Sequence, residues 1–141
     1  MRRTLLLSSV SSCAFALLGG CNSSEDRLLE TEKGQMELRQ IQSRAFETID
    51  REKMLRTIMS TLQDLGFVLD KADAGLGLVT ATKLDRYALR MTVTVRPKGE
   101  KHLLVRASGQ FNDKPVVAPE PYQQFFNSLS RAIFLAAQQV D

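Results

Sequence analysis

Residues 87–96 read Tyr-Ala-Leu-Arg-Met-Thr-Val-Thr-Val-Arg, a stretch in which apolar and polar side chains alternate. In an extended strand successive side chains point to opposite faces, so the odd-numbered residues share one face and the even-numbered residues share the other. A turn at Pro97–Glu100 separates this stretch from His102–Asn112, which alternates in the same way. Two neighbouring strands sorted so cleanly predict an antiparallel sheet with one covered face and one face in water.

Three more strands are expected on the N-terminal side of this pair. Phe67–Lys71 and Leu76–Lys83 contain strand-forming residues and flank a predicted turn at Ala72–Gly75. A second turn at Leu84–Arg86 then leads into the strand that starts at Tyr87. Met36–Phe46 alternates only in part, and we expect a first strand that ends near Phe46.

A helix is predicted over Arg51–Leu65. Asp50 is of a type that caps helix N-termini, and Gly66 can adopt the left-handed conformation that ends a helix. Apolar residues between these two signals recur at helical spacing (Met54, Leu55, Ile58, Met59, Leu62 and Leu65). The methionines could line a groove for a ligand or partner. The continuous apolar stripe instead favours a role in the core.

A last helix of roughly 18 residues is predicted after a proline-rich loop, Asp113–Pro121. Its apolar residues repeat every three or four positions (Tyr122, Phe126, Leu129, Ile133, Ala137 and Val140). Phe125 and Phe134 would widen this stripe, so we expect the helix to cover one face of the sheet.

These elements predict an α+β fold for residues 36–141, in the order β-α-β-β-β-β-α. An antiparallel sheet of four to five strands would carry both amphipathic helices on one face and leave the other face exposed to solvent. The arrangement resembles, in element order, the helix-grip modules of accessory lipoproteins in outer-membrane assembly machines, BamC among them. The chain also resembles small proteobacterial lipoproteins.

The N-terminal residues indicate export. Arg2 and Arg3 precede an apolar run, Thr4–Leu18, and the chain then reads Gly19-Gly20-Cys21 before it turns polar. A basic start, an apolar segment and small residues form a secretory signal peptide. The sequence Leu18-Gly19-Gly20-Cys21 resembles the lipobox of bacterial lipoproteins. This resemblance implies cleavage after residue 20, a diacylglycerol on the Cys21 thiol and, often, an acylated amino terminus; two or more acyl chains make a stable membrane anchor.

Other interpretations of the N-terminus remain open. A membrane-spanning helix would need roughly 20 apolar residues, and Thr4–Leu18 is shorter. An ordinary signal peptide would leave Cys21 as a free thiol. Cys13 also ends a loose lipobox, but cleavage there would leave a short apolar region and expose the apolar residues after it. Asn22 follows Cys21 where aspartate would resemble an inner-membrane retention signal, so the resemblance implies the outer membrane, although a cell-surface location is not excluded.

Residues 21–35 are expected to form the lipidated cysteine and a flexible tether, because few apolar residues occur there. Cleavage would remove Arg2 and Arg3 and leave 17 basic against 16 acidic residues. This near balance gives no argument for nucleic acid as a partner. A single cysteine would remain, so the mature domain could form no internal disulfide and no cysteine-based metal site.

Residue types for catalysis are sparse, and we expect no enzyme activity, no cofactor and no metal. His102 is the single histidine, and no serine lies in a nucleophile-elbow context. A zinc site would need three or four ligands. The glycines around Leu76 lack the lysine of a phosphate loop, and Asp70 and Asp73 flank a turn that explains them.

Arginines on the predicted wet face are the most suggestive surface feature. Arg90 and Arg96 lie on one strand and Arg106 lies on its neighbour. Arginine forks suit phosphate and carboxylate groups, although the same charges could simply keep an open sheet face in water. We expect a periplasm-facing accessory or scaffold subunit of an envelope assembly, secretion or transport complex, with a protein partner. The alternative is a binding module for an envelope glycan, lipid or other anionic ligand through the arginine-bearing face.

Overall fold

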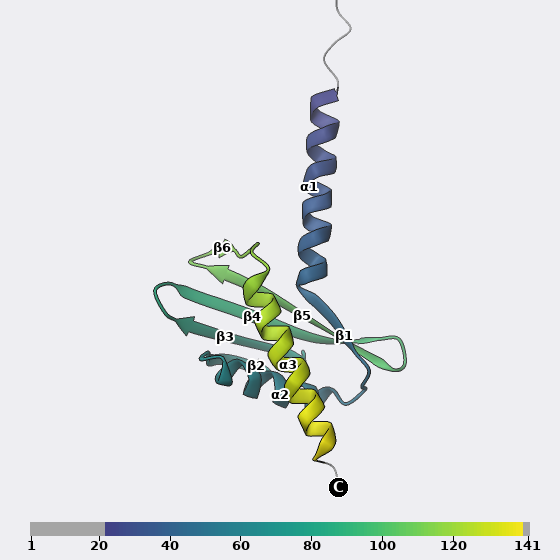
Figure 1. The fold of residues 1–141 in the computed structure, drawn as a ribbon, viewed down its shortest axis with the longest axis vertical. Helices are drawn as coiled ribbons and strands as arrows, with labels where there is room; N and C mark the ends of the chain where they lie inside the picture. Colours follow the sequence, from purple (N-terminus) through teal and green to yellow (C-terminus); the bar gives the residue numbers. More distant parts are fainter. Residues whose placement is uncertain (1–21, 140–141) are drawn as a thin grey trace, which may run out of the picture. The chain divides into compact units, whose positions relative to one another are not determined.

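The computed structural model describes residues 22–139 and shows an α+β fold (Figure 1). The residues predicted to form the signal peptide and lipobox, including Leu18, Gly19, Gly20 and Cys21, lie outside this range. The elements follow one another along the chain as α1 (Asn22–Ile41), β1 (Ser43–Phe46), α2 (Arg51–Asp64), β2 (Val68–Asp73), β3 (Leu78–Leu84), β4 (Ala88–Lys98), β5 (His102–Phe111), β6 (Lys114–Pro115) and α3 (Glu120–Gln138). The predicted order β-α-β-β-β-β-α is confirmed from β1 onward, with α1 and the short β6 as additions.

The strands form one antiparallel sheet in the order β1-β5-β4-β3-β2, and β6 pairs with the end of β5. The centre of the sheet is therefore the β4–β5 hairpin, the pair whose alternation is clearest in the sequence. Thr94 lies opposite Arg106, and Val93 lies opposite Ala107. This register places the even-numbered residues of both strands on one face and the odd-numbered residues on the other.

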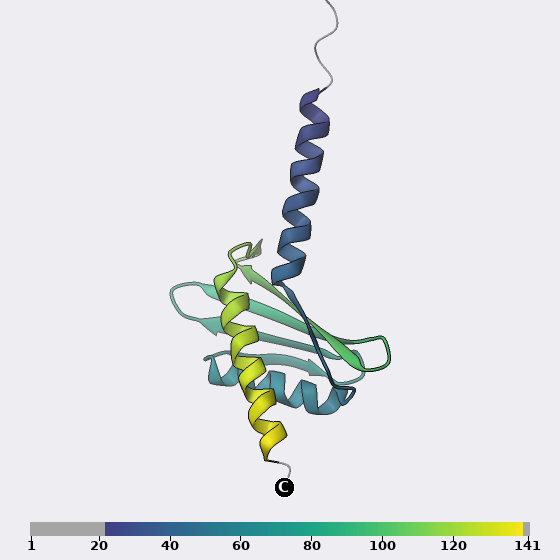
Figure 2. The same ribbon diagram turned by 45° about the vertical axis from the view of Figure 1, so that its right-hand side comes forward.

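Helices α2 and α3 cover one face of the sheet (Figure 2). Odd-numbered side chains in the middle of β4 and β5 are buried beneath them, Met91, Val93, Val95 and Val105 among them. The first half of α3 contributes Tyr122, Phe125, Phe126 and Leu129, while α2 contributes Ile58 and Leu62. The even-numbered side chains of β4 and β5 face away from this core, and neither α2 nor α3 covers them; this side is the open face.

The predicted signals around α2 are confirmed in detail. The Asp50 carboxylate accepts a hydrogen bond from the backbone N–H of Lys53 at 2.9 Å, which caps the helix. At the other end Gly66 has φ +87° and its N–H donates to the carbonyl of Gln63, while the N–H of Phe67 donates to the carbonyl of Leu62. This is the Schellman pattern of helix termination. Phe67 is buried over the last turn.

The prediction of a flexible tether was wrong for residues 22–35. The chain forms a helix from Asn22 to Ile41 instead. Strand β1 runs from Ser43 to Phe46, so the predicted strand end near Phe46 is confirmed, while the partial alternation that begins at Met36 falls within the helix. Residues 27–33 include strong helix formers such as Leu28, Glu30 and Lys33, so propensity favours a helix even though no apolar stripe marks it. The chain divides into two compact units, and the boundary between Lys33 and Gly34 lies within this helix.

Several predicted core positions are exposed, Phe111 and Ala137 among them. Tyr87 was expected on the covered face of the sheet, but it precedes β4 in a turn and is 66% exposed. Phe134 was expected to widen the buried stripe of α3, but it is 63% exposed. All of these positions have suitable periodicity, yet the core does not extend to them.

Candidate functional site

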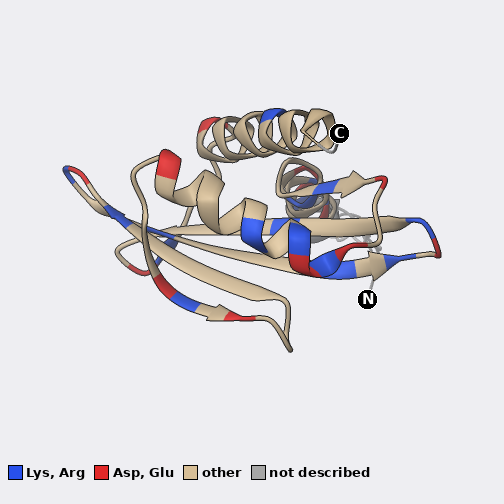
Figure 3. Cartoon of the chain, turned by 90° about the horizontal axis from the view of Figure 1, so that it is seen from below, with Lys and Arg blue, Asp and Glu red and all other residues tan. Residues whose placement is uncertain are grey.

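The open face of the sheet is the candidate site. It carries hydroxyl and basic side chains on its central strands, notably Thr92 and Thr94 on β4 and Ser108 on β5. Strands β1, β3, β4 and β5 contain no aspartate or glutamate at all. Acidic residues of the described chain lie in the helices, the turns and the edge strand β2, and Figure 3 shows this segregation of charge.

Cross-strand pairing arranges the open face in rows. Successive rows of β4 and β5 pair Arg90 with Gln110, Thr92 with Ser108, Thr94 with Arg106, Arg96 with Leu104 and Lys98 with His102. Rows on one face of a sheet repeat every two residues, about 7 Å along the strands. Arg106 and Arg96 therefore occupy adjacent rows, while Arg90 lies about 13 Å from the row of Arg106.

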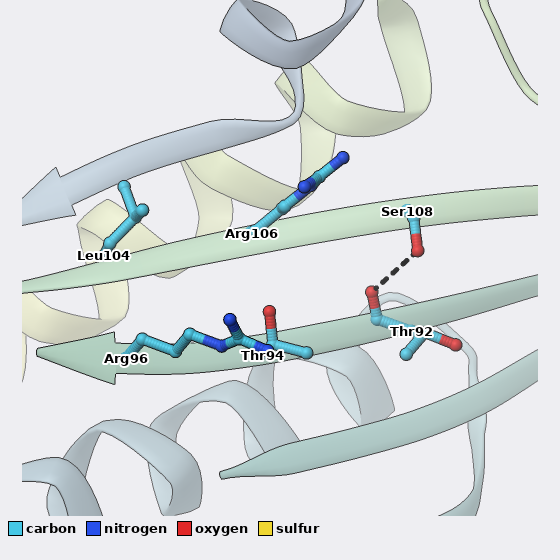
Figure 4. A pocket seen from close by; sticks show the side chains of 6 residues that line it. All are labelled: Thr92, Thr94, Arg96, Leu104, Arg106 and Ser108. Atoms are coloured by element: carbon cyan, nitrogen blue, oxygen red, sulfur yellow. Dashed lines mark hydrogen bonds between the residues drawn. The ribbon is translucent and has the colours of Figure 1, made fainter.

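Arg96 and Arg106 line the same hollow, which has a volume of about 330 Å³. Thr92, Thr94, Leu104 and Ser108 complete its lining (Figure 4). Arg96 extends along β4 toward Thr94, and Arg106 points away from β4, so the two guanidinium groups do not converge on one point. The Ser108 hydroxyl donates a long, 3.5 Å hydrogen bond to the carbonyl of Thr92. A bond of this length is weak, so the hydroxyl remains accessible to a ligand.

Arg90 lines a second hollow of about 280 Å³ at the other end of the same two strands. Gln110, Asn112 and Asp113 are among its neighbours there, so one carboxylate lies in the same hollow as this arginine. The three predicted arginines thus share one face but not one hollow. The periodicity of the strands identifies the shared face; Asp113 belongs to a turn and carries no periodic signal.

Leu104 was missed by the sequence analysis, although its even number places it on the open face. It lines the hollow with Arg96 and Arg106 and is half-buried. Arg44, in contrast, is a basic residue that does not belong to the open face. It lies on the covered side, with its guanidinium 5.0 Å from the ring centroid of Phe126 and donating to the Ser130 hydroxyl at 3.2 Å. Arg44 is therefore a packing residue and not part of the site.

The arginines of the open face have no ionic partner within residues 22–139, where the one ion pair joins Arg56 and Glu52 on α2. In that same range no three His, Cys, Asp or Glu side chains are grouped as a metal site would need. His102 is exposed at the start of β5. The open face can supply positive charge and hydroxyl hydrogen bonds, which suit recognition of anionic groups.

Comparison with protein-family models and with curated proteins gives no match. No protein-family model matches the chain. No curated protein matches it significantly. Among the described helices, none combines the length and apolar character that a membrane span requires.

Proposed function

We propose that the chain is a lipid-anchored protein of the bacterial envelope, held in the outer membrane by acyl chains on Cys21, with its domain in the periplasm. The support for the anchor is Leu18-Gly19-Gly20-Cys21 after the apolar run Thr4–Leu18. Two acyl chains bind a membrane far more stably than one. The domain then acts as a non-enzymatic accessory or scaffold subunit of an envelope assembly, secretion or transport complex.

The observation that carries the binding role is the uncovered, basic sheet face. Both α2 and α3 pack on the opposite side, while Arg96 and Arg106 have no carboxylate partner among the residues described. Interfaces favour arginine, because its planar fork forms directed hydrogen bonds and stacks on neighbouring groups. A partner with anionic groups would complement this surface.

A second candidate is a binding module for an envelope glycan, lipid or other small anion. The specific observation in its favour is the hollow shared by Arg96 and Arg106, because its volume of about 330 Å³ lies at the lower end of the range for small-molecule sites. Its side chains can donate hydrogen bonds to oxyanions.

Crosslinking in intact cells tests the scaffold role. The protein carries a C-terminal tag, and a Cys21→Ala variant serves as the control without an anchor. We expect one envelope protein to be captured repeatedly with the wild type and to be lost with the variant. No recurrent protein, with lipid on Cys21 shown by metabolic labelling, would refute the scaffold role. Absence of lipid on Cys21 would refute the anchor.

Binding to purified envelope lipids and glycans tests the second candidate. We expect a ligand of this hollow to lose binding in the Arg96→Ala plus Arg106→Ala variant, because both side chains line the hollow. Unchanged binding by this variant would place the ligand elsewhere on the domain.

A further inference from the structure

We propose that the open face binds an extended, acidic segment of a partner protein, which lies along β4 and β5 with carboxylates at alternate positions. This proposal rests on the proposed binding role and names the chemistry of the partner. The segment would run over the rows from Arg90 to Lys98.

Charge complementarity identifies the occupant as acidic. Basic residues occupy four of the five rows (Arg90, Arg106, Arg96 and Lys98), and none of these rows holds an aspartate or glutamate. A second copy of this chain would bring the same positive face toward it, and like charges placed opposite one another oppose binding. An acidic segment would instead pair with cations that have no ionic partner among residues 22–139.

The spacing of the rows favours an extended chain. Arg106, Arg96 and Lys98 lie in three successive rows, about 7 Å apart along the strands. Side chains on one face of an extended segment repeat every two residues, at the same distance. Glutamates at alternate positions would therefore each meet one basic row, whereas consecutive glutamates would point half of their carboxylates away.

Hydroxyl groups between the cations can satisfy the polar backbone of such a segment. Thr92 and Ser108 fill the row between Arg90 and Arg106, and Thr94 lies directly opposite Arg106. The threonine side chains are half-buried, whereas the longer arginine side chains are exposed. A bound chain would therefore rest on the threonines, between the long basic side chains. Side-chain pockets that read alternate residues are the usual source of specificity for extended peptides.

An anionic membrane surface is the competing class of partner. Surfaces that lie on membranes combine cations with large apolar side chains that enter the lipid. Leu104 is the single large apolar residue in the five rows, it is half-buried, and the rows contain no phenylalanine, tyrosine or tryptophan. The observations therefore favour a peptide over a bilayer.

Binding of two short synthetic peptides tests the proposal. The lipid-modified chain from Cys21 onward is reconstituted in phosphatidylcholine vesicles, and binding is followed by the fluorescence anisotropy of a dye on the peptide at low ionic strength. The alternating peptide is Glu-Ser-Glu-Ser-Glu-Ser-Glu-Ser-Glu. The clustered peptide has the same composition, with five consecutive glutamates followed by four serines. Each exposed ion pair changes affinity by about 1.4- to 5-fold. We therefore expect the alternating peptide to bind at least about threefold more tightly than the clustered peptide.

Matched variants locate the binding site. Arg96→Gln plus Arg106→Gln removes two charges from the open face and should weaken the alternating peptide about fivefold to tenfold. Lys53→Gln plus Arg131→Gln removes the same charge from exposed positions on α2 and α3 and should change its affinity less than twofold. All four side chains are exposed, so the substitutions leave the core intact.

Three results would overturn the proposal. These are equal affinity for the two peptides, no binding of either peptide, and equal losses from the two double variants. Loss of peptide binding when the vesicles contain phosphatidylglycerol would assign the face to the membrane. These results are independent of the crosslinking experiment, which can still capture a protein at another surface and so uphold the scaffold role.

Discussion

Tyr122 connects four segments of the chain through one buried hydroxyl. This hydroxyl donates to the carbonyl of Val116 at 2.6 Å and accepts from the Gln42 side-chain amide at 3.1 Å and from the N–H of Gly109 at 3.0 Å. The ring itself is fully buried. Buried polar groups are stabilising when all of their partners are present and costly when one is removed. Tyr122 therefore determines how α3 attaches to the sheet.

Replacing Tyr122 by phenylalanine should lower the free energy of unfolding by about 3 kcal/mol, because three buried hydrogen bonds are lost and their partners stay unsatisfied. Urea denaturation followed by circular dichroism measures this change. Tyr87→Phe is the matched control, since Tyr87 is 66% exposed, and it should change stability by less than about 0.5 kcal/mol. Similar values for both variants would contradict the hydrogen-bond network.

Gly77 and Gly99 have nearly the same backbone, with φ +66° and +67°, but different surroundings. A Cβ on Gly77 would lie 2.6 Å from the carbonyl oxygen of Val95 and 2.5 Å from the Arg51 guanidinium, which donates to the carbonyl of Gly75. A Cβ on Gly99 would have no atom within 4 Å. Alanine at Gly99 would therefore report backbone strain alone, whereas alanine at Gly77 would add steric overlap to the same strain.

Gly99→Ala should cost about 1–2 kcal/mol through the left-handed backbone alone. Gly77→Ala should cost about 3–4 kcal/mol, because overpacking adds to the same strain. Chemical denaturation of both variants measures the difference. Equal costs would mean that the turn before β3 moves freely enough to accept the methyl group.

At the scale of elements, α1 depends on local interactions over much of its length. The side chains of residues 27–37 are exposed, and Thr31 donates to the carbonyl of Arg27 at 2.8 Å. Exposed polar helices gain their stability from propensity and from pairs three or four residues apart. Its 20 residues would span about 30 Å, a shorter reach than an extended tether of the same length.

Gly34→Ala should stabilise α1 by about 1 kcal/mol, because glycine is a poor helix former and the added methyl group meets no atom within 4 Å. Far-ultraviolet circular dichroism of the chain from Cys21 onward should show more helix. Gly34→Pro should reduce the helix signal, since proline breaks a helix interior. No response to either change would indicate that this segment is not helical in solution.

The two halves of α3 should respond differently to substitution. Leu129 is fully buried, so Leu129→Ala should cost about 2–5 kcal/mol. Phe134 and Leu135 are 63% and 58% exposed, so Phe134→Ser and Leu135→Ser should each change stability by less than about 0.5 kcal/mol. Thermal or urea unfolding measures all three. A large loss for Phe134→Ser would mean that this side chain is covered in solution.

At the scale of the whole molecule, hydrogen exchange should divide the chain into regions of different stability. Amides of β4 and β5 near Val93 and Val105 lie in the centre of the sheet and should exchange only on global unfolding. Amides of residues 27–33 should exchange at least about a hundredfold faster, because an isolated helical turn opens locally. Mass spectrometry of peptides from the exchanged chain measures both. Equal protection would show that α1 unfolds together with the sheet.

The sequence by itself determined the features that depend on neighbouring residues. The alternation from Tyr87 to Arg96 specifies the two faces of β4, and the Asp50 and Gly66 signals specify both ends of α2, because strand faces and helix caps are local properties of the chain. The α1 helix was missed because no apolar stripe marks it, although its residues have high helix propensity. The resemblance of Leu18–Cys21 to a lipobox is likewise seen in the sequence alone.

Only the tertiary structure decided the features that depend on distant residues. The sheet order placed β1 beside β5, and the register put Arg96 and Arg106 in one hollow and Arg90 with Asp113 in another. The hydroxyl of Tyr122 found its partners in Gln42, Gly109 and Val116, and the core ended before Phe134. Periodicity shows which way a side chain faces, but lateral pairing and the extent of the core follow from packing between distant segments.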